Sequence, residues 1–240
     1  MARVAVVTGG TRGIGEAISV ALKNAGYKVA ANYAGNDERA KAFTDKTGIA
    51  AFKWDVSSFD DCAAGMAKVE AALGPVDIIV NNAGITRDAT MKKMNRNAWD
   101  EVLDTNLGGC FNMCKVAWDG MLNRSFGRIV NIGSINGQAG QYGQVNYAAA
   151  KSGIHGFTKA LSQEGAAKGI TVNAIAPGLV LVEATEYVPE SRHRLYIEQR
   201  ALQREQLPAD VSGVALFALS DLARFVTGQL LPVNGGFVFN

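Results

Sequence analysis

The sequence predicts a single α/β domain over residues 1–240, built on a doubly wound parallel sheet with helices on both faces. Short apolar runs alternate with longer amphipathic stretches, which is the pattern of repeated strand–helix units. The apolar runs consist mostly of Val, Ile and Ala, as expected for strands buried on both faces. The chain has 48% hydrophobic and 19% charged residues, an ordinary balance for a globular protein, and no linker divides it.

The elements follow one another at regular spacing up to residue 178. Strands are predicted at 3–7, 28–33, 50–54, 76–80, 128–132, 171–176 and 229–233. Helices are predicted at about 13–24, 37–47, 58–73, 107–123, 146–168 and 209–220. The segment 179–208 breaks this rhythm with a long connection whose centre is charged and helix-like. Connections of that length in a compact domain are usually lids or binding loops, so we expect a substrate lid at about 179–208.

Charge and cysteine content exclude several classes of protein. The net charge is +2, from 24 basic and 22 acidic residues, which gives no bulk electrostatic reason to expect nucleic acid or membrane binding. No apolar run reaches the roughly 18 residues of a membrane span, and the first residues lack the features of a signal peptide. Three cysteines are too few, and odd in number, for a disulfide framework. With only two histidines besides, we expect no metal site. A cytoplasmic location is expected.

A glycine-rich loop between the first strand and the first helix predicts a dinucleotide site of the Rossmann type. Strand, glycines and helix occur in the required order. Glycine permits the tight turn, and the N–H groups at the start of the helix attract a diphosphate. The expected cofactor-binding residues of this loop are Gly9, Arg12, Gly13, Ile14 and Gly15.

The end of the second strand predicts NADPH rather than NADH. An NAD-specific site places Asp or Glu about 20 residues beyond the glycines. This chain has Asn32, Tyr33 and Ala34 there instead. Arg12 and Arg39 lie close by in sequence, and a guanidinium pairs well with a 2′-phosphate. The alternative is that both arginines are solvated surface residues.

Tyr147 and Lys151 are the candidate proton-transfer pair. They are four residues apart in a predicted helix and therefore share one face. A tyrosine titrates near 10, and a neighbouring ammonium is expected to lower its pKa toward neutrality. Ser134 ends the fifth predicted strand, where its hydroxyl can meet a carbonyl oxygen.

Taken together, the motifs resemble the short-chain dehydrogenase/reductase family over essentially the whole chain. They are the spacing Gly-x-x-x-Gly-x-Gly in the loop, Asn81-Asn82-Ala83-Gly84, Asn106 in Asp-Thr-Asn-Leu, Ser134, Tyr147-x-x-x-Lys151 and Pro177-Gly178. Within the family the chain is most similar to acetoacetyl-CoA reductases of polyhydroxybutyrate synthesis, and next to 3-oxoacyl-acyl-carrier-protein reductases. Three segments carry that closer similarity: 81–88, 136–147 and 165–174.

The resemblance implies an enzyme that reduces a short 3-oxoacyl thioester, acetoacetyl-CoA, to the (R)-3-hydroxyacyl thioester with NADPH. The implied catalytic residues are Asn106, Ser134, Tyr147 and Lys151, with Asn106 holding a water that links Lys151 to solvent. Tyr147 and Lys151 also contact the cofactor. The further cofactor contacts implied are Asp55, Val56, Asn81, Ala83, Gly84, Pro177 and Gly178. A homotetramer is also implied, built on the two long central helices and the last strand.

Glutamines at positions 138, 141 and 144 precede the tyrosine in the segment that lines the acyl pocket of similar reductases. The implied substrate-binding residues are Asp88, Gln141, Tyr142 and Gln144, with Gln141 and Gln144 as amide donors to the thioester carbonyl. Arginines of the lid, Arg194 and Arg200 among them, are expected to reach the phosphates of coenzyme A.

The lid departs from similar reductases. They have Tyr after Pro-Gly and Thr a few positions on, to pack on the substrate and to hold the nicotinamide carboxamide. Leu179 and Val182 stand there in this chain. Thr185 and Tyr187 are the candidates to take over those roles, unless the substrate differs.

Three other functions remain open at this point. The enzyme alternatives are a reductase of acyl-carrier-protein substrates and a secondary-alcohol dehydrogenase or ketone reductase. The alternative from another class is a non-catalytic dinucleotide sensor. Such sensors typically lose the tyrosine or the lysine, and both are present here.

Overall fold

A computed structural model describes residues 2–186 and 188–239, and it contains the predicted parallel sheet. Its seven strands lie in the order β3-β2-β1-β4-β5-β6-β7 and all pair in parallel. The strands are β1 Val4–Val7, β2 Lys28–Tyr33, β3 Ala50–Lys53, β4 Val76–Asn81, β5 Gly127–Ile132, β6 Ile170–Pro177 and β7 Leu230–Val233. The fold is therefore a Rossmann-like single domain, as the strand–helix alternation predicts.

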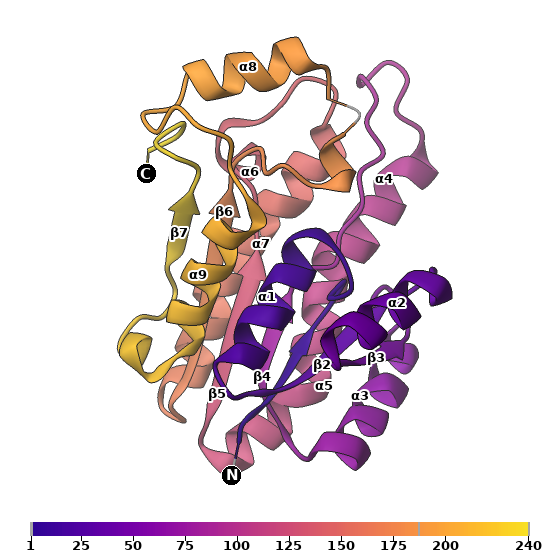
Figure 1. The fold of residues 1–240 in the computed structure, drawn as a ribbon, viewed down its shortest axis with the longest axis vertical. Helices are drawn as coiled ribbons and strands as arrows, with labels where there is room; N and C mark the ends of the chain where they lie inside the picture. Colours follow the sequence, from indigo (N-terminus) through magenta and orange to yellow (C-terminus); the bar gives the residue numbers. More distant parts are fainter. Residues whose placement is uncertain (1, 187, 240) are drawn as a thin grey trace.

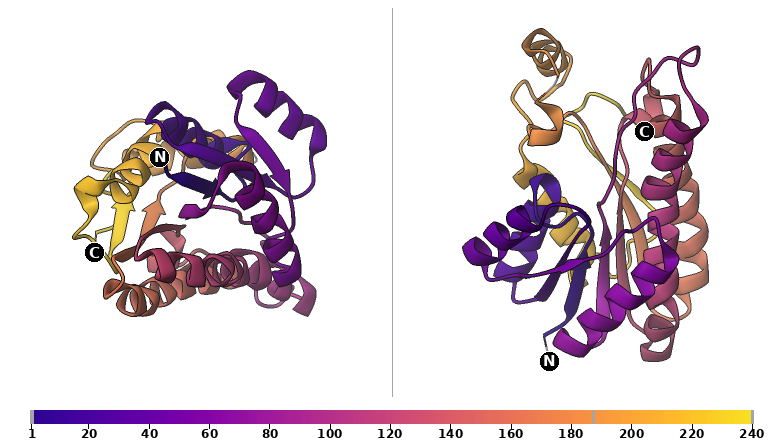
Figure 2. Two further views of the ribbon diagram at one scale, coloured as in Figure 1. Left: turned by 90° about the horizontal axis from the view of Figure 1, so that it is seen from below. Right: turned by 90° about the vertical axis from the view of Figure 1, so that its right-hand side faces the viewer.

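Helices cover both faces of the sheet (Figures 1 and 2). They are α1 Gly13–Asn24, α2 Asp37–Thr47, α3 Phe59–Leu73, α4 Arg96–Leu103, α5 Gly109–Arg124, α6 Asn136–Ala139, α7 Val145–Ala166, α8 Glu190–Glu198 and α9 Pro208–Leu219. One buried cluster joins the sheet to α1, α2 and α9, and another joins it to α3 and α5. Because both clusters share the sheet, its central strands are buried on both sides, which explains their unbroken apolar runs.

The strand order reverses beside β1, and this reversal positions the site. Strand β1 pairs with β2 on one side and with β4 on the other, so Val7 lies opposite both Ala31 and Val80. The connections from β1 and β4 leave toward opposite faces, which opens a crevice at the carboxyl ends of the strands. The glycine loop follows Val7 directly and lies in that crevice.

Helices α4 and α6 were not predicted, and α5 begins later than predicted. Helix α4 was not predicted, because its eight residues lack a long apolar repeat. The helix predicted at 107–123 begins at Gly109, since a π-helical turn, Asp104–Gly108, precedes it. The segment 179–208 contains a short 3₁₀ turn, Glu183–Thr185, and the charged helix α8, in line with the predicted charged centre. No helix in the described ranges is long and apolar enough to cross a membrane.

Helix α3 approaches the sheet closely where Gly65 faces the indole of Trp54. A Cβ on Gly65 would lie 2.4 Å from Trp54 Cδ2, and Trp54 is only 5% exposed. Gly65→Ala should therefore destabilise the fold by about 1–3 kcal/mol, the usual cost of overpacking a core. Urea unfolding followed by circular dichroism measures the difference.

Gly213→Ala on α9 is the matched control. No atom lies within 4 Å of the position of its added Cβ. The helical preference of alanine should then stabilise the protein by up to about 1 kcal/mol. Equal stability of the two variants would contradict the packing argument.

Candidate active site

The glycine loop has a backbone that only glycine adopts without strain. Gly9 and Gly13 have φ of +59° and +53°. A Cβ on Gly15 would lie 2.1 Å from the carbonyl oxygen of Gly9. In the described part of the chain no side chain caps α1, so its first N–H groups face the crevice. This cradle fits the diphosphate of a dinucleotide.

Hydrogen bonds from Thr8 and Asn82 fix the loop against the segment after β4. The hydroxyl of Thr8 accepts from the backbone N–H groups of Asn82 and Ala83, both at 2.9 Å. The Asn82 amide donates to the carbonyls of Thr8 and Gly9 at 2.9 and 3.2 Å. The two cofactor-binding stretches predicted separately, the glycine loop and Ala83-Gly84, are thus one structural unit.

Asn32 holds the loop from the other side. Its carbonyl accepts from Gly10 N–H at 2.9 Å, and its side-chain oxygen accepts from Gly9 N–H at 3.3 Å. Its amide donates to the carbonyl of Trp54 at 2.9 Å. Sequence reasoning treated Asn32 only as a missing acid and passed over Asn82. Both asparagines belong to sequence stretches that predict cofactor binding, but only the fold shows where their amides point.

The predicted adenosine-side residues divide into two groups. Asp55 is exposed at the crevice, with Oδ1 accepting from the N–H and hydroxyl of Ser57 at 2.9 and 2.8 Å. Val56 is buried beside it and its carbonyl accepts from Asn112. Asn81 differs from both, because its side chain faces the interior of the protein.

Asn81 belongs to a buried polar chain that crosses the sheet toward α7. It donates to Asn131 Oδ1 at 2.8 Å, and Asn131 donates to Thr158 Oγ1 at 2.9 Å. Asn81 is 4% exposed. Its amide is therefore committed to β5, and the predicted contact of Asn81 with the adenosine ribose stays a prediction.

The two candidate phosphate-binding arginines differ in their surroundings. Arg12 is exposed at the start of α1. Arg39, on the first turn of α2, pairs with Glu183 of the lid at 2.8 Å. The segment 179–208, the predicted lid, also lies next to the glycine loop, since a Cβ on Gly13 would lie 3.5 Å from the side chain of Val182. An incoming phosphate at Arg39 therefore meets a guanidinium that already holds a carboxylate.

Ser134, Tyr147 and Lys151 come together at the carboxyl end of β5. Tyr147 and Lys151 share one face of α7, as predicted, and Tyr147 is hydrogen-bonded to Ser134. The Ser134 hydroxyl accepts from the N–H of Asn136 at 3.1 Å. Lys151 Nζ donates to the carbonyl of Ile132 at 2.6 Å and lies 5.6 Å from the centre of the Tyr147 ring.

Burial determines the protonation of this group. It raises the pKa of Tyr147, the hydrogen bond from Ser134 lowers it, and the charge of Asp88 raises it further. Burial also lowers the pKa of Lys151 to about 8. The expectation that the ammonium lowers the pKa of the phenol is therefore wrong here. Lys151 bonds to a backbone carbonyl, and desolvation dominates at both side chains.

Asn106 lies in the π-helical turn, a form often found at functional sites. Its side chain is fully buried: Oδ1 accepts from Ile85 N–H at 2.8 Å and Nδ2 donates to Ile85 O at 3.0 Å. A Cβ on Gly84 would lie 3.2 Å from Asn106 Oδ1 and 3.8 Å from Lys151 Nζ. Gly84 thus leaves open the space between Asn106 and Lys151.

The segment after β6 lies next to Ser134. The carbonyl of Pro177 accepts from Ile135 N–H at 3.0 Å, next to Ser134. A Cβ on Gly178 would lie 2.8 Å from Gln206 Oε1. The predicted pair Pro177-Gly178 therefore lies beside the candidate catalytic group, at the start of the lid.

The four expected substrate-binding residues differ in their hydrogen bonds and exposure. Gln144 is engaged at both ends of its amide: it donates to Asp88 at 2.7 Å and accepts from Asn136 at 2.8 Å. Asp88 and Gln144 thus hold the loop together. Tyr142 is 86% exposed and does not line the interior. Gln141 accepts from the hydroxyl of Tyr196 on α8 at 3.3 Å, a contact that sequence reasoning did not anticipate.

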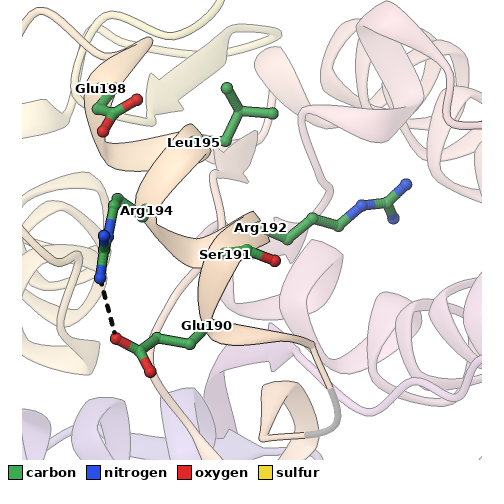
Figure 3. A pocket seen from close by; sticks show the side chains of 6 residues that line it. All are labelled: Glu190, Ser191, Arg192, Arg194, Leu195 and Glu198. Atoms are coloured by element: carbon green, nitrogen blue, oxygen red, sulfur yellow. Dashed lines mark hydrogen bonds and ion pairs between the residues drawn. The ribbon is translucent and has the colours of Figure 1, made fainter.

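The lid arginines do not form the expected basic face. Arg200 is 5% exposed and donates to the carbonyls of Leu179 and Arg204 at 3.0 and 3.1 Å. Arg204 pairs with Asp210 at 2.7 Å. Figure 3 shows a surface hollow along α8, where Arg192 and Arg194 extend on opposite sides and Arg194 pairs with Glu190. The expectation that Arg200 binds phosphate is corrected, because its guanidinium anchors the base of the lid.

Thr185 is likewise committed within the lid. Its hydroxyl donates to the carbonyl of Val180 at 2.7 Å and accepts from Val182 N–H at 3.1 Å. The other candidate for the nicotinamide or substrate role, Tyr187, lies outside the described residues. Within those residues there is also no group of three His, Cys, Asp or Glu side chains that could hold a metal.

Comparison with known proteins identifies the family. A model described as short chain dehydrogenase matches residues 3–193. The chain belongs to this family. The chain is 61% identical to an acetoacetyl-CoA reductase of Rhizobium meliloti (strain 1021) and 58% identical to one of Shinella zoogloeoides, each over 240 residues and all of both chains. It is 40% identical to the 3-oxoacyl-[acyl-carrier-protein] reductase FabG of Staphylococcus aureus (strain MW2), over 98% of each chain.

The resemblance found in the sequence is thus confirmed, and the dehydrogenase is an oxidoreductase that uses a nicotinamide dinucleotide. The glycine cradle and the uncapped start of α1 fit the diphosphate of such a cofactor.

The buried lysine gives a direct test of the electrostatics. An exposed lysine titrates near 10.4. Because burial penalises the charged form, the ammonium of Lys151 should lose its proton near pH 8. The ¹³Cε resonance of Lys151 in ¹³C-lysine-labelled dehydrogenase measures this midpoint, and Lys151→Met assigns the resonance. A midpoint of about 10 or above would contradict the desolvation argument.

Proposed function

We propose that the protein reduces acetoacetyl-CoA to (R)-3-hydroxybutyryl-CoA with NADPH. The observation that carries the proposal is the juxtaposition of Ser134, Tyr147 and Lys151 at the mouth of the cofactor crevice. The reductases that match over the full length of the chain support the choice of substrate. The (R) configuration rests on the family resemblance.

Three side chains act on the carbonyl that is reduced. Bound NADPH supplies the hydride to the β-carbon. Tyr147 donates its phenolic proton to the carbonyl oxygen, and its raised pKa keeps the phenol protonated at neutral pH. Ser134 donates a hydrogen bond to the same oxygen as negative charge develops there. For this the Ser134 hydroxyl turns its hydrogen from Tyr147 to the substrate, while its oxygen still accepts from the Asn136 N–H.

Lys151 serves both the cofactor and the proton supply. It would hold the hydroxyls of the nicotinamide ribose, and its ammonium is the proton source that restores the Tyr147 phenol. Its lowered pKa, about 8, makes the ammonium a better proton donor than an exposed lysine. Asn106, across the gap at Gly84, orders a water that links Lys151 to solvent.

The remaining cofactor contacts follow from the crevice. Gly9, Gly13, Ile14 and Gly15 would hold the diphosphate, Asp55 and Val56 the adenine, and Pro177-Gly178 the nicotinamide. Arg12 and Arg39 bind the 2′-phosphate, which has to displace Glu183 from Arg39 or share the guanidinium with it.

A homotetramer is part of the same proposal. Exposed apolar side chains support it: Phe111 on α5 is 52% exposed, and Leu222 and Phe225, which precede β7, are 82% and 101% exposed. Such side chains mark association surfaces when they cluster. A cytoplasmic location is proposed as well, and the three buried free cysteines are consistent with a reducing compartment.

Tyr147→Phe tests the proposed reaction. The variant lacks the transferable proton but keeps the ring, so turnover of acetoacetyl-CoA should fall by about 10²–10⁴-fold. NADPH affinity, measured by fluorescence titration, should stay within a few fold. Wild-type turnover in the variant would remove Tyr147 from the mechanism, and failure of the unmutated protein to oxidise NADPH with acetoacetyl-CoA would overturn the substrate assignment.

Arg39→Gln tests the cofactor assignment. A charge-assisted contact to phosphate contributes about ten- to a hundred-fold in affinity, so NADPH binding should weaken by that factor while NADH binding barely changes. Glu183→Gln should act in the opposite direction, because it removes a carboxylate that competes for the same guanidinium.

Lys41→Gln on the same helix is the charge-matched control, since Lys41 pairs with Asp45 on the exposed face. Equal losses for Arg39→Gln and Lys41→Gln would show a general charge effect. Equal affinity of the unmutated protein for NADH and NADPH would contradict the assignment.

A further inference from the structure

Tyr196 connects the lid to the loop that precedes Tyr147. Its hydroxyl donates to Gln141 Oε1 at 3.3 Å, across 55 residues of sequence. Its ring stacks on Phe237 near the end of the chain, with centroids 5.0 Å apart and planes 29° from parallel. The side chain is partly buried. The stacking orients the ring, so the hydroxyl reaches Gln141 from a defined direction.

In the structure the Gln141 amide turns its carbonyl oxygen toward the Tyr196 hydroxyl. A glutamine amide can present either its carbonyl oxygen or its NH₂ group after a half-turn about the last side-chain bond. Because Oε1 accepts from Tyr196, the NH₂ group is the end directed away from the lid. An amide held in this orientation donates hydrogen bonds and suits a carbonyl acceptor.

Gln144 cannot provide the same donor without losing structure. Its NH₂ group donates to Asp88 at 2.7 Å and its oxygen accepts from Asn136 at 2.8 Å. It is also 9% exposed. A short β-ketothioester carries a second carbonyl next to the one that Ser134 and Tyr147 bind. Gln141, three residues earlier on the same loop, is the glutamine whose orientation fits that carbonyl.

We propose that Tyr196 is a positioning residue that orients the Gln141 amide toward the thioester carbonyl of the substrate. The inference rests on the proposed function and deepens it, because it makes the lid helix a determinant of preference for β-ketothioesters over simple ketones. A ketone without a second carbonyl gives the oriented NH₂ group no substrate partner and forgoes that hydrogen bond.

Tyr196→Phe removes the hydroxyl and keeps the ring that stacks on Phe237. With NADPH, kcat/KM for acetoacetyl-CoA should fall about five- to tenfold, the effect of one neutral hydrogen bond. The value for 2-pentanone, which has a single carbonyl, should stay within about twofold, so the ratio of the two substrates falls. NADPH affinity should not change. Tyr27→Phe, a tyrosine packed against the core, is the matched control and should leave the ratio unchanged.

A double-mutant cycle separates positioning from a structural effect on the lid. In a Gln141→Ala background, Tyr196→Phe should cause no further loss with acetoacetyl-CoA, because the amide that it orients is absent. Additive losses, or equal losses with thioester and ketone, would overturn the proposal, as would an unchanged ratio in Tyr196→Phe. None of these results affects the proposed function, which fails only if the unmutated protein does not reduce acetoacetyl-CoA.

Discussion

The hydrogen bonds that join Thr8 to the segment after β4 are the constraint on which the site depends. They bind the loop after β1 to the loop after β4 at the point where the strand order reverses. Asn82 reinforces the junction by holding the Gly9 carbonyl, against which Gly15 packs with no room for a Cβ. The junction keeps the start of α1 open to a diphosphate and places Gly84 beside Lys151. Cofactor binding and proton supply therefore share one rigid base.

Burial of the candidate catalytic side chains is the second constraint on the site. Lys151 lies in the interior with its Nζ on a backbone carbonyl, and Tyr147 is hydrogen-bonded to Ser134. Desolvation favours the neutral form of both side chains, so a charge that appears during the reaction is stabilised by fixed dipoles rather than by water. The segment 179–208 adds to this enclosure through two contacts that reach the rest of the protein: Arg39 with Glu183, and Tyr196 with Gln141.

The sequence was sufficient for the features that are local in the chain. Strand–helix alternation predicts the sheet and both helical layers. The spacing of Tyr147 and Lys151 predicts a shared helix face, and a serine after a buried strand predicts its place at the sheet edge. Residue type alone was a poor guide to side chains whose partners lie far away in sequence. Gln144 and Arg200 looked like substrate contacts, yet each is occupied by neighbours from other elements.

Asn82, Glu183 and Tyr196 were missed for the same reason, because their contacts appear only when the segments pack.

The central claim is that the site accommodates a substrate with two neighbouring carbonyls, one at Ser134 and Tyr147 and the other at Gln141. The most direct measurement compares kcat/KM for acetoacetyl-CoA, acetoacetyl-acyl-carrier protein and 2-pentanone, from the absorbance of NADPH at about 340 nm. The account predicts that acetoacetyl-CoA exceeds the ketone by about ten- to a hundred-fold and also exceeds the carrier-protein substrate. A ketone that matches or outperforms acetoacetyl-CoA would contradict it.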